Sequence, residues 1–179
     1  MPNLLYSIFV SRRLKVPLFY AGDLRKVNGQ LVNCTITALE QNTASDQVVL
    51  ATPPVKKDFI NLQQDQLDQT TALLILGGPT DEHPFTYDDF EKIIDKFIAF
   101  CTQNQLKGLI TNSRRTPNLD RYFQKTKIPK NIQLHLVQTK NALSLVQLIK
   151  QATYIFVTED STSMLAETIQ SGRFICSIY

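Results

Sequence analysis

The sequence contains no tryptophan, three cysteines, two histidines and no long uncharged apolar run. The cysteines, Cys34, Cys101 and Cys176, are far apart and odd in number, and no CxxC pair occurs. We therefore expect reduced thiols and a cytoplasmic location instead of a disulfide framework. The two histidines, His83 and His135, stand alone without metal-ligand spacing, so the sequence predicts no metal site.

The sequence also lacks a membrane span and a strongly basic surface. No apolar stretch approaches the roughly 20 residues that a membrane-spanning helix requires. The apolar run at 4–10 is followed, and not preceded, by Arg12 and Arg13, which makes it a poor signal peptide. A net charge of +3 over 179 residues is too mild for a dedicated nucleic-acid binder. With 43% hydrophobic and 20% charged residues, the composition is that of an ordinary globular protein.

Short apolar runs alternate with amphipathic segments in the second half of the chain. Strands are predicted at 72–76, 108–111, 132–137, 154–157 and 174–178, and helices at 87–102, 118–125, 141–151 and 161–170. Thr86 and Asn141 are the predicted N-caps of the first and third helices, and Cys101 belongs to the apolar stripe of the first. The alternation predicts an α/β fold, a Rossmann-like parallel sheet with helices on both faces.

Residues 1–60 are less regular and predict a partial N-terminal Rossmann-like domain. A helix is expected at 4–14 and strands at 17–20 and 48–51, and the polar run 61–71 has the character of a linker. We place the boundary near residue 60, so that residues 61–179 form the second domain. No covering helix follows the last predicted strand, which indicates either a minimal form or a piece of something longer.

Three polar turns follow strands of the predicted sheet. In the first, Gly77 and Gly78 permit positive φ and a close approach of a ligand to the backbone. A tight strand-to-loop turn explains these glycines equally well. The pattern is neither GxGxxG nor the P-loop, so a dinucleotide or P-loop site is disfavoured.

The second turn, residues 111–117, places two arginines directly after a strand. The guanidinium groups of Arg114 and Arg115 are suited to bidentate binding of phosphate oxygens. In α/β sheets, ligands bind at strand ends. The alternative is a solvated basic turn in which Thr116 caps a helix that begins at Pro117.

The third turn combines a strand end, clustered hydroxyl groups and a helix N-terminus. Free N–H groups and the helix dipole make such a place suited to phosphate. Glu167 is a candidate acceptor for ribose or sugar hydroxyls. A plain helix start, capped by Asp160 or Ser161, is the alternative. The candidate hydroxyl donors to phosphate are Thr158, Ser161 and Ser163.

No nucleophile with an adjacent base is evident in the sequence. Cys101 is expected in the core, and the acidic residues of the helix at 87–102 are expected to be solvated. The run Asp81-Glu82-His83, just after the glycine turn, offers a histidine beside carboxylates as an acid or base. A plain polar loop is the more common use of such residues, so no catalytic residue is assigned.

The three turns together resemble, in order and spacing, the family named for plant mitochondrial fission, the elongated-mitochondria proteins, with its many bacterial relatives. The strongest element is Ser113–Pro117, where this family typically has a serine–arginine–arginine–threonine–proline run. The next strongest is the segment from Thr158 to Met164, with Glu167 following. The resemblance covers residues 70–179 well and is loose before them.

The resemblance implies a glycosyltransferase-like protein of the GT-B fold, in which two Rossmann-like domains face each other across a cleft. Residues 61–179 would correspond to the C-terminal domain, which holds a nucleotide-sugar donor. The glycines would lie under the phosphates, the arginines would face the diphosphate or the base, and Glu167 would hold ribose hydroxyls. The implied nucleotide-sugar-binding residues are Gly77, Gly78, Ser113, Arg114, Arg115, Thr116, Thr158, Asp160, Ser161, Ser163, Met164 and Glu167.

The sequence departs from the family pattern in three ways. Most of the first domain has no counterpart, the usual Gly-Lys-Pro is Gly172-Arg-Phe174, and the C-terminal helices that cross back over the first domain are absent. In a GT-B protein, acceptor binding and any general base would come from that first domain. We therefore expect that truncation limits catalysis by this chain alone.

Three functions remain open on the sequence. The first is a metal-independent, glycosyltransferase-like protein that binds a nucleotide sugar and needs no cofactor besides this donor. The second is a non-catalytic interaction protein built on the same fold, and the third is a small sensor of nucleotides or phosphosugars. An uncovered apolar face on the second domain further predicts a homodimer.

Overall fold

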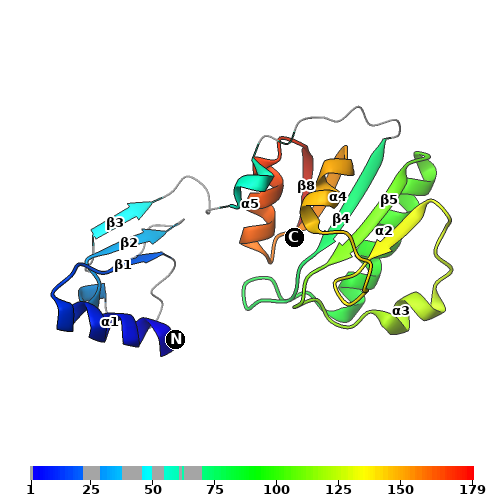
Figure 1. Ribbon diagram of the computed structural model, residues 1–179. Coiled ribbons are helices and arrows are strands. Elements are labelled where there is room, and N and C mark those ends of the chain that lie inside the picture. The colour runs from blue at the N-terminus through cyan, green and yellow to red at the C-terminus, as the bar shows by residue number, and fades with distance from the viewer. Residues whose placement is uncertain (1, 22–28, 38–45, 50–54, 61, 63–69) are drawn as a thin grey trace. The chain divides into compact units, whose positions relative to one another are not determined.

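The chain forms two compact units, Met1–Pro54 and Val55–Tyr179. The computed structural model describes residues 2–21, 29–37, 46–49, 55–60, 62 and 70–179 (Figure 1). The greater part of the linker predicted at 61–71 lies outside these residues. None of the helices in the described ranges is both long and apolar enough to cross a membrane.

The first unit consists of a helix and a small parallel sheet, shown alongside each other in Figure 1. Helix α1 confirms the predicted N-terminal helix, whereas β2 was not predicted because its four residues carry no extended pattern. β1 starts later than the predicted 17–20, since Pro17 has no N–H to donate to a ladder and the Leu18 N–H donates to the Asn33 side chain. Of the strand predicted at 48–51, residues 50–51 lie outside the described residues. The elements are α1 (Pro2–Leu14), β1 (Phe19–Ala21), η1 (Gly29–Leu31), β2 (Cys34–Thr37) and β3 (Asp46–Val49).

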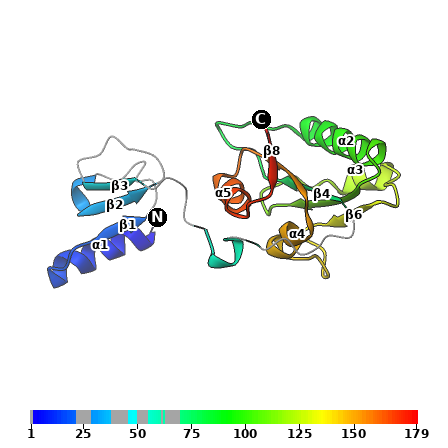
Figure 2. The ribbon, with the colours of Figure 1, turned by 90° about the horizontal axis from the view of Figure 1, so that it is seen from above.

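The second unit is a five-stranded, all-parallel sheet in the order β6-β5-β4-β7-β8. Helices lie on opposite faces of this sheet, as α2 and α4 show in Figure 2. The predicted α/β class is therefore confirmed. The strands are β4 (Thr71–Leu76), β5 (Lys107–Asn112), β6 (Ile132–His135), β7 (Tyr154–Thr158) and β8 (Phe174–Ile178). The helices are η2 (Lys57–Phe59), α2 (Tyr87–Gln103), α3 (Asp120–Lys125), α4 (Leu145–Gln151) and α5 (Thr162–Gln170).

Strand β4 lies at the centre and is buried at every position. Successive side chains of a strand point to opposite faces, so β4 contributes to two apolar cores. Leu74 and Leu76 pack with α2 and α3 on one face. Leu73 and Ile75 pack with α4, α5 and Phe59 on the other. A continuous apolar run such as 72–76 is typical of a strand that is covered on both faces.

The helix starts follow local capping chemistry. Thr86 caps α2 through a capping box with Asp89, as predicted. The predicted cap Asn141 is wrong, because Ser144 and Gln147 form the capping box of α4, and this helix therefore begins at Leu145. Serine followed three residues later by glutamine satisfies two N–H groups at once. The alternative interpretation of the second turn, in which Thr116 caps a helix, is also wrong, since α3 begins at Asp120.

The turn between α5 and β8 is bonded to the end of α4 through Arg173. Gly172 has a φ of 72°, the left-handed conformation that glycine adopts most readily. The Arg173 guanidinium then donates to the carbonyl of Lys150, at 3.1 Å, in the last turn of α4. A cation is favourable at this end of a helix because the helix dipole is negative there. Arg173, one of the two residues that depart from the family pattern, thus has a structural role in this chain.

We expect Thr86→Ala to lower the free energy of unfolding by about 1 kcal/mol, because the substitution removes the side-chain acceptor for the Asp89 N–H. Urea unfolding followed by circular dichroism measures this change. Thr102→Ala, at an exposed position near the other end of α2, is the matched control. An equal loss in both variants would show that capping is not the cause.

Candidate functional site

The strand order reverses between β4 and β7. From β4 the chain adds β5 and β6 on one side and then returns to add β7 and β8 on the other. Ile75 pairs with Thr111 of β5 and with Val157 of β7, so the three strands end at the same level. In open α/β sheets, ligands bind at such a reversal, outside the carboxyl ends of the strands. All three polar turns of the sequence begin there.

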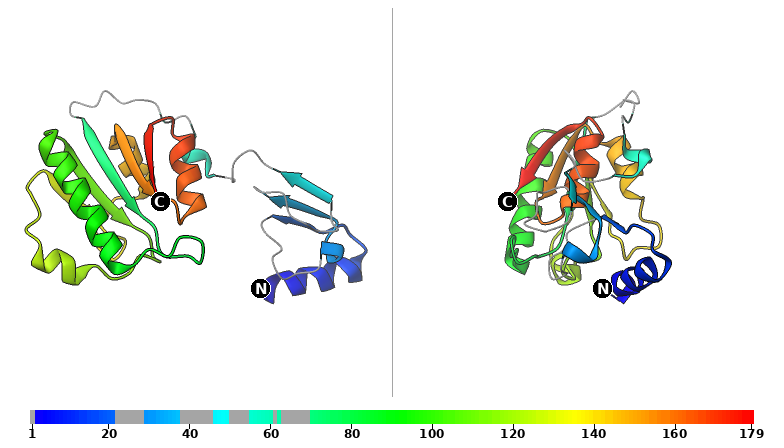
Figure 3. Two further views of the ribbon diagram at one scale, coloured as in Figure 1. Left: turned by 180° about the vertical axis from the view of Figure 1, so that it is seen from behind. Right: turned by 90° about the vertical axis from the view of Figure 1, so that its left-hand side faces the viewer.

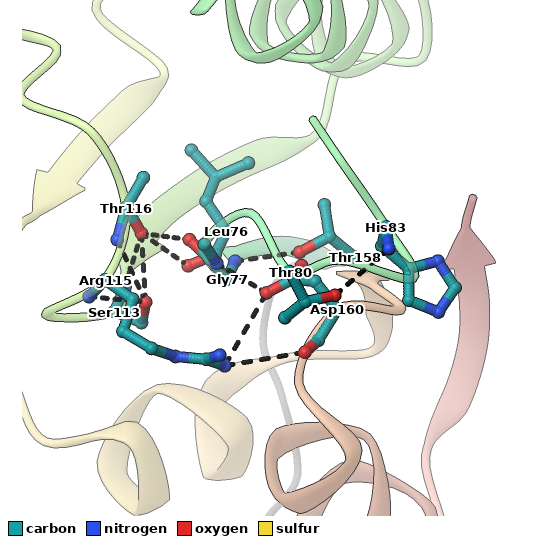
Figure 4. A network of polar contacts seen from close by, with 10 residues as sticks. Leu76, Gly77, Thr80, His83, Ser113, Arg115, Thr116, Thr158 and Asp160 are labelled. Carbon is teal, nitrogen blue, oxygen red and sulfur yellow. Dashed lines mark hydrogen bonds and ion pairs between the residues drawn. The ribbon is translucent and has the colours of Figure 1, made fainter. Parts of the chain in front are cut away.

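The glycine turn after β4 is hydrogen-bonded to the turn after β7 (Figure 4). The Gly77 N–H donates to Thr158 Oγ1 at 2.8 Å, and the Gly78 N–H donates to Asp160 Oδ2 through a short bond. Thr158 and Asp160 are both buried. A Cβ atom on Gly77 would overlap the Asp160 carboxylate, so the turn requires glycine at this position. The first and third turns are therefore held together by groups that the resemblance implied to be nucleotide-sugar-binding residues.

The turn after β5 is attached to the same point through Thr116. Its hydroxyl lies 3.0 Å from the carbonyl of Leu76, also contacts the carbonyl of Gly77, and accepts from the Ser113 N–H at 2.9 Å. A Cβ atom on Gly78 would overlap the backbone of Arg115, which shows how closely the two turns pack. Thr116 thus stabilises the turn and does not cap a helix.

Arg115 places a positive charge at the solvent-exposed edge of this network. Its Nη2 atom lies 3.8 Å from Asp160 Oδ2 and 3.5 Å from the Asp160 carbonyl. The Arg115 side chain is 52% exposed, whereas that of Asp160 is fully buried. The other carboxylate oxygen, Oδ1, is buried without a hydrogen-bond partner among the described residues. Arg114 is exposed, and within the described part of the chain no hydrogen bond or ion pair connects it to the network.

The start of α5 differs from the starts of α2 and α4. Ser161 occupies the N-cap position, but its side chain accepts no hydrogen bond from the helix. The first N–H groups of a helix have no partner within the helix, so those of α5 lack the side-chain acceptor that α2 and α4 have. Ser163 is exposed in this first turn, whereas Met164 packs into the apolar core shared with α4.

Glu167 lies on α5, which contacts η2. Burial raises the pKa of its carboxyl group, and the nearby Lys56 ammonium opposes this shift. Glu167 is half-buried, and among the described residues it has no hydrogen bond to the other candidates. Lys56 was not found by sequence reasoning, because no motif links it to a residue more than a hundred positions away.

The remaining sequence candidates lie elsewhere or are enclosed in the core. The Thr80 hydroxyl accepts from the His83 N–H at 3.0 Å, so the loop after the glycines is closed by its own turn. His83 lines a cavity of about 940 Å³ between α2 and the last two strands. Cys101 is fully buried in α2, as predicted, and burial raises the pKa of its thiol to about 12. Within the described part of the chain, no three metal-ligating side chains cluster.

The sequence matches a known family over most of its length. The family model described as mitochondrial fission ELM1 matches residues 30–178. The chain belongs to this family. The match confirms the resemblance seen in the three turns and extends it forward to residue 30. A search of curated proteins returned no significant match.

Among solved structures, the crystal structure of Acinetobacter baumannii MurG is similar to this chain. The sequence identity is 12% and the TM-score is 0.46. The similarity covers 95% of this chain and 56% of that chain. The ELM1-family chain therefore spans a little over half the length of this structure.

Sequence reasoning about this ELM1-family chain gave no role to two polar side chains, one at the start of the second turn and one on the neighbouring strand β6. Asn112 Oδ1 accepts from the Val137 N–H at 2.8 Å, and its amide donates to Gln138 at 3.3 Å. His135 Nδ1 accepts from the Leu143 N–H, and burial, with a smaller effect of Lys107, lowers the His135 pKa. Asn112 directly precedes the serine of the motif, so its position at the strand end was the available signal.

We expect Thr116→Val to destabilise the fold by about 1–3 kcal/mol, because it preserves the shape and leaves buried backbone groups without their partner. Chemical denaturation measures the change in the free energy of unfolding. Thr139→Val, at an exposed site whose hydroxyl makes no hydrogen bond to the described residues, is the control and should stay near wild type. A neutral Thr116→Val would mean that the three turns are held together by other contacts.

We expect Glu167→Gln to become stabilising relative to wild type as the pH rises. A raised folded-state pKa favours folding while the group is protonated, and this contribution is lost as the pH rises from the ordinary value of 4.5 through the folded value. Urea unfolding at about pH 4 and at neutral pH measures the difference. If the charge of Lys56 outweighed burial, the glutamine variant would lose stability at neutral pH instead.

Proposed function

We propose that the second unit binds the diphosphate of a nucleotide sugar or nucleoside diphosphate at the ends of β4, β5 and β7. The observation that carries this proposal is the start of α5, whose N–H groups have no side-chain cap, beside the half-exposed cation of Arg115. Unpaired N–H groups and the positive end of the helix dipole attract phosphate. The reversal of strand order at the same point supports this location.

The network divides the candidate residues into two roles. Thr116, Thr158 and Asp160, together with Gly77 and Gly78, hold the three turns in place by bonds that are already satisfied. We assign phosphate binding to groups outside these bonds: the α5 N–H groups, the hydroxyls of Ser161 and Ser163, Arg114, and Arg115, whose half-exposed guanidinium also contacts Asp160. Glu167 and Ser113 stay as candidate contacts to the ribose and base.

The chemistry that such a site supports is glycosyl transfer without a metal. When a sugar leaves a nucleoside diphosphate, negative charge grows on the diphosphate oxygens. Arginine side chains and oriented N–H groups stabilise that charge in a fixed geometry. The family resemblance to GT-B glycosyltransferases supports the same assignment. In this proposal Val55–Tyr179 is the donor-binding domain and Met1–Pro54 is part of the first domain, from which the acceptor site would come.

We expect nucleoside diphosphates or nucleotide sugars to raise the thermal stability of the full chain. A ligand at about 100 times its dissociation constant stabilises the folded state by roughly 2.7 kcal/mol. Arg115→Ala should weaken binding roughly 10- to 100-fold, the value of a charged hydrogen bond. Arg121→Ala, an equally basic change on exposed α3, should bind like wild type.

The readout is the shift of the unfolding temperature over a panel of diphosphates with different bases and sugars, with pyrophosphate included. The unfolding temperature of each variant without ligand is measured first, since Arg115 also faces Asp160. Folded wild-type protein that responds to no member of the panel would refute the proposal. Equal weakening by Arg115→Ala and Arg121→Ala would indicate general charge attraction and not this site.

A further inference from the structure

Asp160 lies where the turn after β7 joins helix α5. Its carboxylate accepts from the Gly78 N–H, and the next residue, Ser161, is the N-cap of α5. Helix α5 contacts β7 and lies beside β8, as Figure 3 shows in orange-red and red. Asp160 therefore connects the glycine turn with the start of the helix that has no side-chain cap.

The side chain of Asp160 is a carboxylate without access to solvent. Its exposed fraction is zero, and its Oδ1 atom has no hydrogen-bond partner among the described residues. Burying such a charge is costly unless a cation lies close to it. A neutral asparagine oxygen would also accept from the Gly78 N–H. The bond to Gly78 therefore does not by itself require a charge at position 160.

Arg115 is the cation that meets this carboxylate, as the dashed lines in Figure 4 show. Its Nη2 atom donates to the Asp160 carbonyl at 3.5 Å and lies 3.8 Å from Asp160 Oδ2. In the part of the chain that the structure describes, no other acidic side chain forms an ion pair with Arg115. Both contacts use one nitrogen of the guanidinium group, so its other N–H donors stay available to a second anion.

The backbone of Arg115 is also fixed. Its N–H donates to Ser113 Oγ at 3.1 Å, and it packs so closely on Gly78 that a Cβ atom there would overlap it. The long side chain beyond this backbone is half-exposed. A free arginine side chain samples many rotamers and loses that freedom when a ligand fixes it. A contact that holds the guanidinium in advance reduces this loss and so favours binding.

We propose that Asp160 is a positioning residue, which holds the Arg115 guanidinium beside the start of α5 in the orientation that binds phosphate. This inference rests on the proposed function, because the ligand is the diphosphate assigned to the same place. Asp160 itself does not touch the ligand. Its negative charge repels phosphate, and in this role its effect through Arg115 outweighs that repulsion.

A double-mutant cycle separates action through Arg115 from a purely structural role. Asp160→Asn removes the charge and keeps an oxygen that can accept from the Gly78 N–H. Calorimetric titration of the full chain with inorganic pyrophosphate gives the dissociation constants of wild type, both single variants and the double variant with Arg115→Ala. We expect Asp160→Asn to weaken binding roughly three- to tenfold when Arg115 is present, a usual coupling between groups in contact. In the Arg115→Ala background the same change should leave binding unchanged or strengthen it, because only the repulsion is then removed.

Two further variants are matched controls, and circular dichroism establishes that each is folded. Thr158→Val removes the hydrogen bond to the Gly77 N–H between the same two turns without changing a charge. It should therefore alter pyrophosphate binding equally with and without Arg115. Asp120→Asn removes an exposed carboxylate of α3 and should bind like wild type.

The possible results of the cycle differ in what they overturn. Equal weakening by Asp160→Asn in both backgrounds would show that the carboxylate only holds the turns together. Tighter binding in both backgrounds would show that it only repels the ligand. Either result would overturn this inference and leave the proposed function standing. Folded wild-type protein that binds neither pyrophosphate nor a nucleoside diphosphate would refute the proposed function, and this inference with it.

Side-chain relaxation measured by NMR tests the same contact in the wild-type protein without a ligand. The Nε–H group of Arg115 should show a higher heteronuclear NOE than those of Arg114 and Arg121, which lie at exposed positions. An Arg115 side chain as mobile as theirs would show that Asp160 does not hold the guanidinium. That result would overturn the inference even if Asp160→Asn fails to fold.

Discussion

The register of β4 with its two neighbours is the constraint on which the candidate site depends. Ile75 is paired with Thr111 on one side and with Val157 on the other, and β4 is buried along its whole length. Slipping a strand by one residue would turn its apolar side chains to the wrong face. Burial on both faces therefore fixes where β4, β5 and β7 end, and it brings turns separated by more than thirty residues to one place.

At the end of β4, the glycine turn is hydrogen-bonded to both of the other turns. The N–H groups of Gly77 and Gly78 are bound by Thr158 and Asp160, and the carbonyls before them contact Thr116. The sequence left a close approach to a ligand and a tight turn as equal explanations of these glycines, and in the structure they lie close to Asp160 and Arg115. The phosphate-binding role proposed above accordingly moves outward, to Arg115 and the start of α5, while the buried hydroxyl and carboxylate groups hold these elements in position.

Much of the second unit could be predicted from the sequence because its signals are local. Apolar runs at 72–76 and 174–178 became β4 and β8, and Thr86 capped α2, since a capping hydroxyl acts within three residues. The start of α4 was misplaced because Asn141 and Ser144 are both good caps, and only the glutamine at 147 distinguishes them. Strand β2 was missed because four residues carry too little pattern, and Lys56 because its effect on Glu167 exists only in the folded chain.

The sequence alone determined the α/β class, the membership of the mitochondrial fission ELM1 family and the three segments that form the candidate site. These depend on hydrophobic periodicity and on motifs, which are properties of neighbouring residues. The tertiary structure decided which members of those segments are already bonded and which stay open. It also decided that Arg115 meets Asp160, a residue 45 positions further along the chain. Hydrogen-bond partners and strand order arise from contacts between distant residues, so no local pattern specifies them.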